Sequence, residues 1–255
     1  MEEIQDIQYA PQHGIRGLGD LFLPDEPRRA PLALCIHGGG WNAMDKYSWA
    51  GVAQLMCEQG FAAFNINYRL LDQAPWPACG DDCLAAANFL YEFSHPLMKQ
   101  LSRSQGLVII GGSAGGHLAL MTGLRLPRDR VRAIVSISGP SDLLLRAQRT
   151  GRDFYHTFFG TKGEITDRML LEASPVSYVK PNSPPLLCVH STNDKLVMIT
   201  QARRMIQMYQ DLGARAELFA YSGPGEQHGI WIDDSDPHRL LSEPDNAVCA
   251  FLKSV

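Results

Sequence analysis

An apolar run that ends in glycines around a serine is the feature that most constrains the fold of this chain. Residues 107–110 (LVII) are followed by Gly-Gly-Ser-Ala-Gly-Gly at 111–116 and then by helix-forming residues. This order predicts a strand, a sharp turn and a helix, with Ser113 at the turn. Such a turn crowds the positions two before and two after the serine, where Gly111 and Gly115 stand. Ser113 is therefore the candidate nucleophile.

A second glycine-rich segment, His-Gly-Gly-Gly-Trp at 37–41, follows another apolar run. Successive glycines expose backbone N–H groups to a ligand without obstruction by side chains. We expect the N–H groups of Gly39 and Gly40, with that of Ala114 at the helix start after Ser113, to stabilise a developing oxyanion. Which glycine N–H points inward stays open.

A serine nucleophile needs a general base, and eight histidines compete for this role. We assign it to His228, which lies between glycines in a loop after the last predicted strand. His117 is predicted to be packed within a helix, and His190 to hydrogen-bond a neighbouring loop. The remaining histidines are His37 in the glycine loop, His156 as a substrate contact, and His13, His95 and His238 without supporting context.

The carboxylate that orients the base is assigned to Asp194, which follows the predicted strand 185–190. Asp142, after the preceding strand, is the main competitor. Asp233 and Asp234 lie too close to His228 in sequence to be preferred. The order Ser113, Asp194, His228 is that of α/β-hydrolases.

Apolar strands alternate with amphipathic helices, which predicts an α/β fold with a mostly parallel sheet and helices on both faces, in one domain, 1–255. A cap-like insertion at about 141–174 is expected over the C-terminal edge of the sheet, where open α/β folds bind ligands. The predicted strands are Ile4–Tyr9, Leu18–Leu23, Leu32–Ile36, Phe61–Ile66, Leu107–Ile110, Val131–Ile137, Pro185–His190 and Glu217–Tyr221. The predicted helices are Tyr47–Gln59, Asp81–Phe93, Ser113–Leu124, Thr200–Leu212 and Pro244–Leu252.

The composition of the chain limits its possible binding partners and its possible cellular location. A net charge of −4 without a basic stripe argues against nucleic acid, and no apolar run reaches membrane-spanning length. The acidic N-terminus lacks the apolar region of a secretory signal. The six cysteines are scattered, and no second pair of cysteines or histidines accompanies Cys79 and Cys83 to complete a metal site. We therefore expect free thiols, which suit a cytoplasmic protein. The sequence leaves a homodimer open.

Several motifs together resemble one branch of the α/β-hydrolases, the hormone-sensitive-lipase-like and feruloyl/acetyl-esterase-like serine esterases. These motifs are His-Gly-Gly-Gly-Trp at 37–41, Asn-Tyr-Arg-Leu at 67–70, the glycine-flanked Ser113, Asp194 and His228. The resemblance spans nearly the whole chain and implies that Ser113, Asp194 and His228 form a triad. Arg69 and Asp82 are then expected to be structural, as an ion pair beneath the site.

The expected function is that of a serine carboxylic ester hydrolase that forms an acyl-enzyme and needs no metal or organic cofactor. Its small-molecule substrates are expected to be short-chain acyl or aryl esters, with acetylated or feruloylated carbohydrates as candidates. Trp41, His156 and Phe158 are the predicted substrate contacts. Two alternatives remain: an amide hydrolase similar to kynurenine formamidase, and a catalytically silent α/β-hydrolase that binds a ligand.

Overall fold

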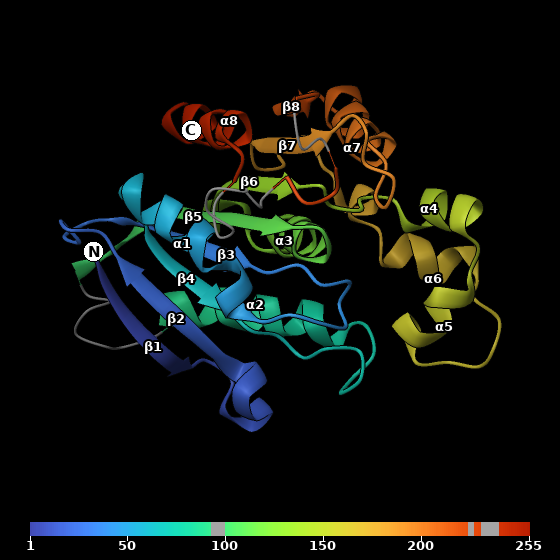
Figure 1. Ribbon diagram of the computed structural model, residues 1–255, viewed down its shortest axis with the longest axis horizontal. Coiled ribbons are helices and arrows are strands. Elements are labelled where there is room, and N and C mark those ends of the chain that lie inside the picture. Colours follow the sequence, from blue (N-terminus) through green and yellow to red (C-terminus); the bar gives the residue numbers. More distant parts are fainter. Residues whose placement is uncertain (93–99, 224–226, 231–239) are drawn as a thin grey trace.

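A computed structural model describes residues 1–92, 100–223, 227–230 and 240–255 (Figure 1). The described residues form one eight-stranded sheet in the order β1-β2-β4-β3-β5-β6-β7-β8. The pairs β1/β2 and β2/β4 are antiparallel, and all the other neighbouring pairs are parallel. The predicted mostly parallel α/β sheet is thus confirmed.

The strands and helices follow the predicted order. The strands are β1 Glu2–Gln8, β2 Leu18–Leu23, β3 Pro31–Ile36, β4 Ala62–Ile66, β5 Ser102–Gly112, β6 Val131–Ile137, β7 Leu186–Ser191 and β8 Ala216–Tyr221. The helices are α1 Ala50–Glu58, α2 Ala78–Glu92, α3 Ala114–Arg125, α4 Leu143–Thr150, α5 Asp153–Phe159, α6 Asp167–Glu172, α7 Thr200–Asp211 and α8 Ser242–Lys253.

The sheet carries a hydrophobic core on each face, because alternate residues of its central strands point to opposite sides. Leu34 and Ile36 of β3 belong to the core beneath α2, α3 and α7. Ala33 and Cys35 of the same strand belong to the core beneath α1 and α8. This burial on both faces explains the continuous apolar runs. All six cysteines are free thiols, and Cys79 and Cys83 are fully buried in α2.

Three elements begin three or more residues away from their predicted starts, and the other predicted elements differ by at most two residues at either end. β5 extends from Ser102 to Gly112 rather than over 107–110, because its polar first half has no apolar signal and its last two glycines pair with β6. The predicted helix at 47–59 begins as a 3₁₀ turn, Lys46–Trp49, before α1. The helix predicted over 81–93 begins at Ala78, and its predicted last residue, Phe93, lies outside the described residues.

The stretch predicted as an insertion contains three short helices, α4, α5 and α6. They lie together at the end of the molecule toward which the arrows of β5, β6 and β7 point (Figure 1). This is the edge at which the candidate nucleophile stands, since Ser113 directly follows β5. Within the described ranges, no helix is both long and apolar enough to cross a membrane.

Candidate active site

Ser113 occupies a strained turn between β5 and α3, with a φ of +53°. A Cβ at Gly111 would lie 2.2 Å from the Gly115 carbonyl oxygen, and a Cβ at Gly115 would lie 2.1 Å from the Ile36 oxygen. Any side chain at either position would therefore force the turn apart. The serine itself is largely buried and stands at the C-terminal edge of the sheet.

The structure brings the three predicted triad residues into one hydrogen-bonded chain. His228 Nδ1 lies 2.7 Å from Asp194 Oδ2, and His228 Nε2 lies 2.8 Å from Ser113 Oγ. A carboxylate can only accept, so Nδ1 carries the proton and Nε2 is left to accept the serine hydroxyl proton. The geometry is that of a serine, a base and an orienting acid.

Asp194 is buried, and its carboxylate is held by four groups. The backbone N–H groups of Leu196 and Val197 donate to Oδ1 at 2.9 and 2.8 Å, while His228 donates to Oδ2. Burial raises the pKa of this carboxyl, but the hydrogen bonds from His190, His228 and Val197 outweigh burial and hold the pKa below its usual 3.8. Asp194 therefore stays ionised across the physiological pH range.

His190, at the end of β7, is the fourth of these groups. Its Nε2 lies 2.6 Å from the Val197 carbonyl oxygen and 3.4 Å from Asp194 Oδ2. Both are acceptors, so Nε2 carries a proton that faces the carbonyl and the carboxylate together. The predicted bond from His190 to a neighbouring loop is confirmed. Its contact with Asp194 was not predicted, because a histidine four residues before an aspartate carries no pattern of its own.

The glycine loop passes directly beside the nucleophile. A Cβ on Gly38 would lie 3.4 Å from Ser113 Cβ. Gly39 and Gly40 have φ angles of +97° and +60°, which favour glycine. Among the described residues, no acceptor is recorded for the backbone N–H groups of Gly39, Gly40 or Ala114. These are the three predicted oxyanion donors, and their role stays a prediction.

A buried histidine and tyrosine support the glycine loop from behind. His37 Nδ1 donates to the Gly38 carbonyl oxygen at 2.8 Å, and its ring stacks on Tyr68 at 4.2 Å between centroids. The Tyr68 hydroxyl donates to the carbonyl oxygens of His37 and Gly38. Burial lowers the pKa of His37 to about 4, so this imidazole is neutral at pH 7.

Trp41 ends the loop and links it to α3 and to the inserted stretch. Its indole N–H donates to His117 Nδ1 at 3.2 Å, which leaves His117 Nε2 to donate to the Ala173 carbonyl oxygen at 2.8 Å. Phe158 packs against the Trp41 ring, with 5.1 Å between centroids. His117 is fully buried, as predicted for a packed histidine, and burial lowers its pKa to about 4.

The predicted substrate contacts lie in different environments. Phe158 has no exposed surface and packs behind Trp41, which is itself buried. Phe154 is the exposed member of this aromatic group. His156 Nδ1 lies 3.1 Å from the Thr161 carbonyl oxygen and faces a surface hollow bordered by Arg152 and residues 164–167. Contact of Trp41, His156 or Phe158 with a substrate stays a prediction.

The competing carboxylates lie elsewhere. Asp142 caps α4 through Leu145 N–H at 2.9 Å and lies 3.5 Å from Arg204 Nε, and no contact with His228 is recorded within the described parts of the chain. Arg69 and Asp82 form the expected ion pair, with 2.7 Å between Nη2 and Oδ1. Asp233, Asp234, His95 and His238 lie outside the described residues.

A buried lysine just after the glycine loop was missed by the sequence analysis. Lys46 Nζ lies 2.6 Å from Asp20 on β2 and 2.8 Å from Asp6 on β1. Its backbone N–H donates to Asn67, and its carbonyl oxygen accepts from Asn65. The loop is thereby fastened to the antiparallel side of the sheet. No motif marks a lysine whose partners are so distant in sequence.

Comparison with known proteins places this site in a family. The family model described as BD-FAE matches residues 19–209, which include the glycine loop, Ser113 and Asp194. The chain belongs to the BD-FAE family. The family match ends before His228, so the predicted base lies in a segment beyond the match. Across the described ranges, no group of three or more histidine, cysteine or acidic residues is arranged to hold a metal ion.

Two curated relatives of this BD-FAE member are esterases of Mycobacterium tuberculosis. Esterase LipQ is 27% identical over 274 residues, which cover 98% of this chain and 62% of the relative. Esterase LipC is 26% identical over 254 residues, which cover 91% and 60%. The chain spans about three fifths of the length of these two relatives.

A solved structure shows the same fold. The truncated form of a carbohydrate esterase from gut microbiota superposes with a TM-score of 0.83 at 22% identity, over 100% of this chain and 96% of that chain. The BD-FAE member therefore has the α/β-hydrolase fold, as its strand order and elbow indicate.

Proposed function

We propose that this BD-FAE family chain is a serine carboxylic ester hydrolase. The observation that carries the proposal is the hydrogen-bonded chain from Asp194 through His228 to Ser113. Three backbone N–H groups, for which no acceptor is recorded among the described residues, are the proposed oxyanion donors. The two mycobacterial relatives bear the name esterase, which supports the same reaction class. We also propose that the chain acts as one domain, in which residues 141–174 form a small cap.

The reaction follows from the protonation states. His228 Nε2 takes the Ser113 proton as Oγ attacks the ester carbonyl carbon, and the N–H groups of Ala114 and the glycine loop stabilise the oxyanion. Asp194 stabilises the imidazolium that forms. His228 then gives its proton to the leaving alkoxide, which departs as the alcohol. Water, deprotonated by the same nitrogen, releases the acid and restores Ser113.

Substrates of moderate size are the proposed choice. The aromatic residues Phe154 and Phe158 of α5 pack against Trp41 at the end of the glycine loop, which brings the proposed cap close to the proposed oxyanion donors. Esters of short acids, including acetylated or feruloylated carbohydrates, are the proposed class. The solved carbohydrate esterase is consistent with this choice.

A fluorophosphonate probe tests the nucleophile. We expect stoichiometric labelling that Ser113→Ala abolishes and that Ser177→Ala, at an exposed serine, leaves intact. Full esterase activity in Ser113→Ala would contradict the proposal.

Parallel assays with p-nitrophenyl acetate and N-formylkynurenine separate ester hydrolysis from amide hydrolysis. Rapid deformylation of N-formylkynurenine with negligible turnover of the ester would identify the reaction as amide hydrolysis. An absence of labelling would favour the silent, ligand-binding alternative.

A further inference from the structure

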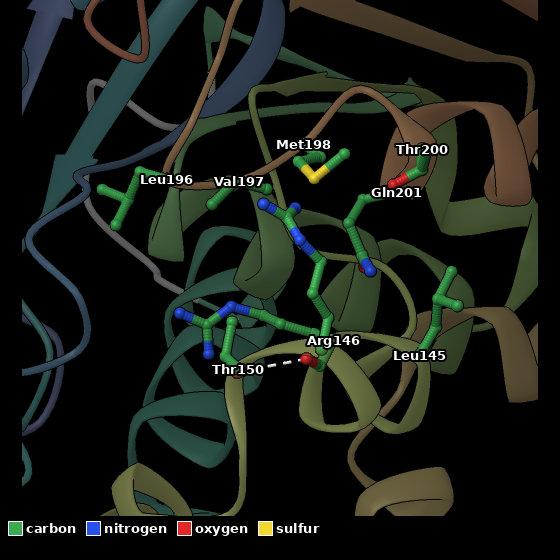
Figure 2. A pocket seen from close by; sticks show the side chains of 9 residues that line it. Leu145, Arg146, Thr150, Leu196, Val197, Met198, Thr200 and Gln201 are labelled. Carbon is green, nitrogen blue, oxygen red and sulfur yellow. Dashed lines mark hydrogen bonds between the residues drawn. The ribbon is translucent and has the colours of Figure 1, made fainter.

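A cavity of about 220 Å³ lies between α4 and the segment that follows Asp194 (Figure 2). Leu196 and Val197 form one wall, and their N–H groups are the ones that hold Asp194 Oδ1. The cavity therefore shares a wall with the triad. Its volume is below that of pockets that enclose a whole ligand, about 300 Å³ or more, so it suits one arm of a substrate.

Arg146 enters this cavity from α4. Figure 2 shows its side chain extending from the helix toward Val197 and Met198. The guanidinium stacks over the Phe154 ring at 5.6 Å, and Nη1 lies 3.4 Å from the Tyr155 hydroxyl. Its Nε is buried and has no hydrogen-bond partner among the described residues.

The charge of Arg146 is not neutralised where the chain is described. No carboxylate lies within ion-pair distance, since Asp142, one turn earlier on the chain, faces Arg204 instead. A half-buried guanidinium without a counter-ion is costly, and its planar fork matches the two oxygens of a carboxylate. Arg149 on the same helix lines the cavity with a second positive charge and has no recorded ion pair in the described ranges.

Gln201 supplies a further donor from the opposite side. Its side chain is only 3% exposed, and Oε1 accepts the backbone N–H groups of Ser141 at 2.8 Å and Asp142 at 2.7 Å. These two bonds fix the amide so that Nε2 points the other way, and no acceptor for Nε2 is recorded among the described residues. Figure 2 shows the end of Gln201 turned toward α4 and Arg146.

Residues that line the cavity contact residues near the nucleophile through two chains of packing. Phe154, which carries the Arg146 guanidinium, packs on Trp41 with 5.8 Å between ring centroids, and Trp41 directly follows Gly40. Val197, on the other side, contacts Asp194. Arg146 and Val197 are thus each two contacts or fewer from the glycine loop or from Asp194. Leu196 and Met198 give the cavity an apolar lining between these points.

We propose that this cavity binds a carboxylate carried by the ester substrate, with Arg146 as its charge partner and the Gln201 amide as a second donor. The inference rests on the proposed ester hydrolysis and specifies its substrate: an ester that also bears a free acid group on a short arm. The apolar lining takes the arm, and the ester carbon reaches Ser113.

Matched esters test the charge requirement. On the alcohol side, 4-acetoxybenzoate is compared with its neutral analogue 4-acetoxybenzamide; on the acyl side, monophenyl adipate is compared with the corresponding phenyl adipamate. We expect one pair to show a preference for the anion, at least about tenfold in kcat/KM and mainly through KM, that weakens as salt screens the charge.

Variants locate the preference. Arg146→Met keeps the apolar stem, so it should remove the preference for the anion while turnover of the neutral ester stays within twofold, which also shows that the variant is folded. Arg168→Met, at an exposed arginine of α6, makes the same charge change and should leave the preference intact. A preference absent in the wild type, or unchanged in Arg146→Met, would overturn the proposal.

A binding experiment separates this inference from the reaction itself. If none of the four esters is cleaved, the proposed hydrolysis fails. Calorimetric titration with adipate then tests, independently of hydrolysis, whether the cavity binds a carboxylate. Binding by the wild type that Arg146→Met loses supports carboxylate recognition, and a wild type that does not bind adipate refutes it.

Discussion

The indole N–H of Trp41 donates to Nδ1 of His117 across 3.2 Å, and this bond joins the glycine loop to the helix that begins beside Ser113. It also decides the tautomer of His117, whose other nitrogen holds Ala173 at the end of the inserted stretch. One neutral imidazole thus fixes the relative positions of three segments that border the nucleophile.

Trp41→Phe should lower turnover while keeping an aromatic ring in place. His117 Nδ1 would be left buried without a donor, at a cost of about 1–3 kcal/mol in the free energy of unfolding. The loop would also lose one of its anchors, and we expect kcat to fall more than KM changes. Steady-state kinetics and urea unfolding measure both effects. Trp76→Phe alters the same aromatic group without touching the loop, and an equal loss of kcat in that variant would contradict the prediction.

Stability should fall as the pH drops from about 6.5 toward 4. Burial lowers the pKa of His37 and of His117 to about 4, so the folded state binds fewer protons than the unfolded state in this range. The stabilisation from these neutral imidazoles is complete above the unfolded pKa of about 6.5 and is lost as the pH falls, on the order of 3 kcal/mol for each residue. Urea unfolding at several pH values gives the slope of the free energy of unfolding against pH. His117→Gln should reduce that slope by about one proton, and an unchanged slope would count against the assignment.

Gly40→Ala should reduce turnover, by up to about a hundredfold, if the Gly40 N–H stabilises the oxyanion. Alanine keeps this N–H but is strained at a φ of +60°, so we expect the peptide to rotate and turn the N–H away from the oxyanion. Gly60 offers a matched control, because both glycines have a positive φ and a Cβ at either one would meet nothing within 4 Å. The backbone strain of the two alanine variants is therefore similar. Gly40→Ala should lose esterase activity and Gly60→Ala should keep it, and comparable activity in the two variants would contradict an oxyanion role for the Gly40 N–H.

His190→Leu should lower kcat about tenfold with little change in KM. The substitution removes the N–H that faces Asp194 and leaves the Val197 carbonyl oxygen without its donor. His190→Gln can place a side-chain N–H near the same point and should restore most of the activity. If the His190→Leu and His190→Gln variants have equally low kcat, His190 contributes packing and not the orientation of Asp194.

Lys46→Met should destabilise the protein by about 3–5 kcal/mol, because Asp20 would keep a buried charge without a counter-ion. Replacing both partners, as Lys46→Met with Asp20→Asn, should recover part of this loss. Thermal and urea denaturation of the two variants measure the difference. A double variant less stable than the single one would show that the ion pair is not the origin of the effect.

The order of the eight strands and of five of the helices could be predicted from local patterns, and the three residues of the predicted triad from those patterns together with the family resemblance; α4, α5 and α6 were expected only as an insertion. Continuous apolar runs marked the strands that are buried on both faces, and the elbow marked Ser113 because steric crowding leaves a glycine signature. Asp194 and His228 were found because each follows a predicted strand whose C-terminal end lies on the same edge of the sheet.

Contacts made by single residues across long sequence distances could not be predicted. Lys46 meets Asp20 and Asp6 only after three strands have paired, and no periodicity records such a meeting. Arg146 carried no signal either, since an arginine on an amphipathic helix usually faces water. The polar first half of β5 was missed because its pairing, not its composition, makes it a strand.

The separation of Ser113 and Asp194 is set by the sheet itself. Their strands, β5 and β7, are two places apart in the sheet, which corresponds to about 10 Å at the usual strand spacing. A single imidazole, that of His228 in the segment after β8, bridges the two side chains. Because β8 pairs with β7, a slip of one residue between β6 and β7 would carry Asp194 and the strand before His228 away from Ser113 with every amino acid unchanged. The register of the strands thus sets the distance on which the proposed chemistry depends, although none of the strand residues takes part in it.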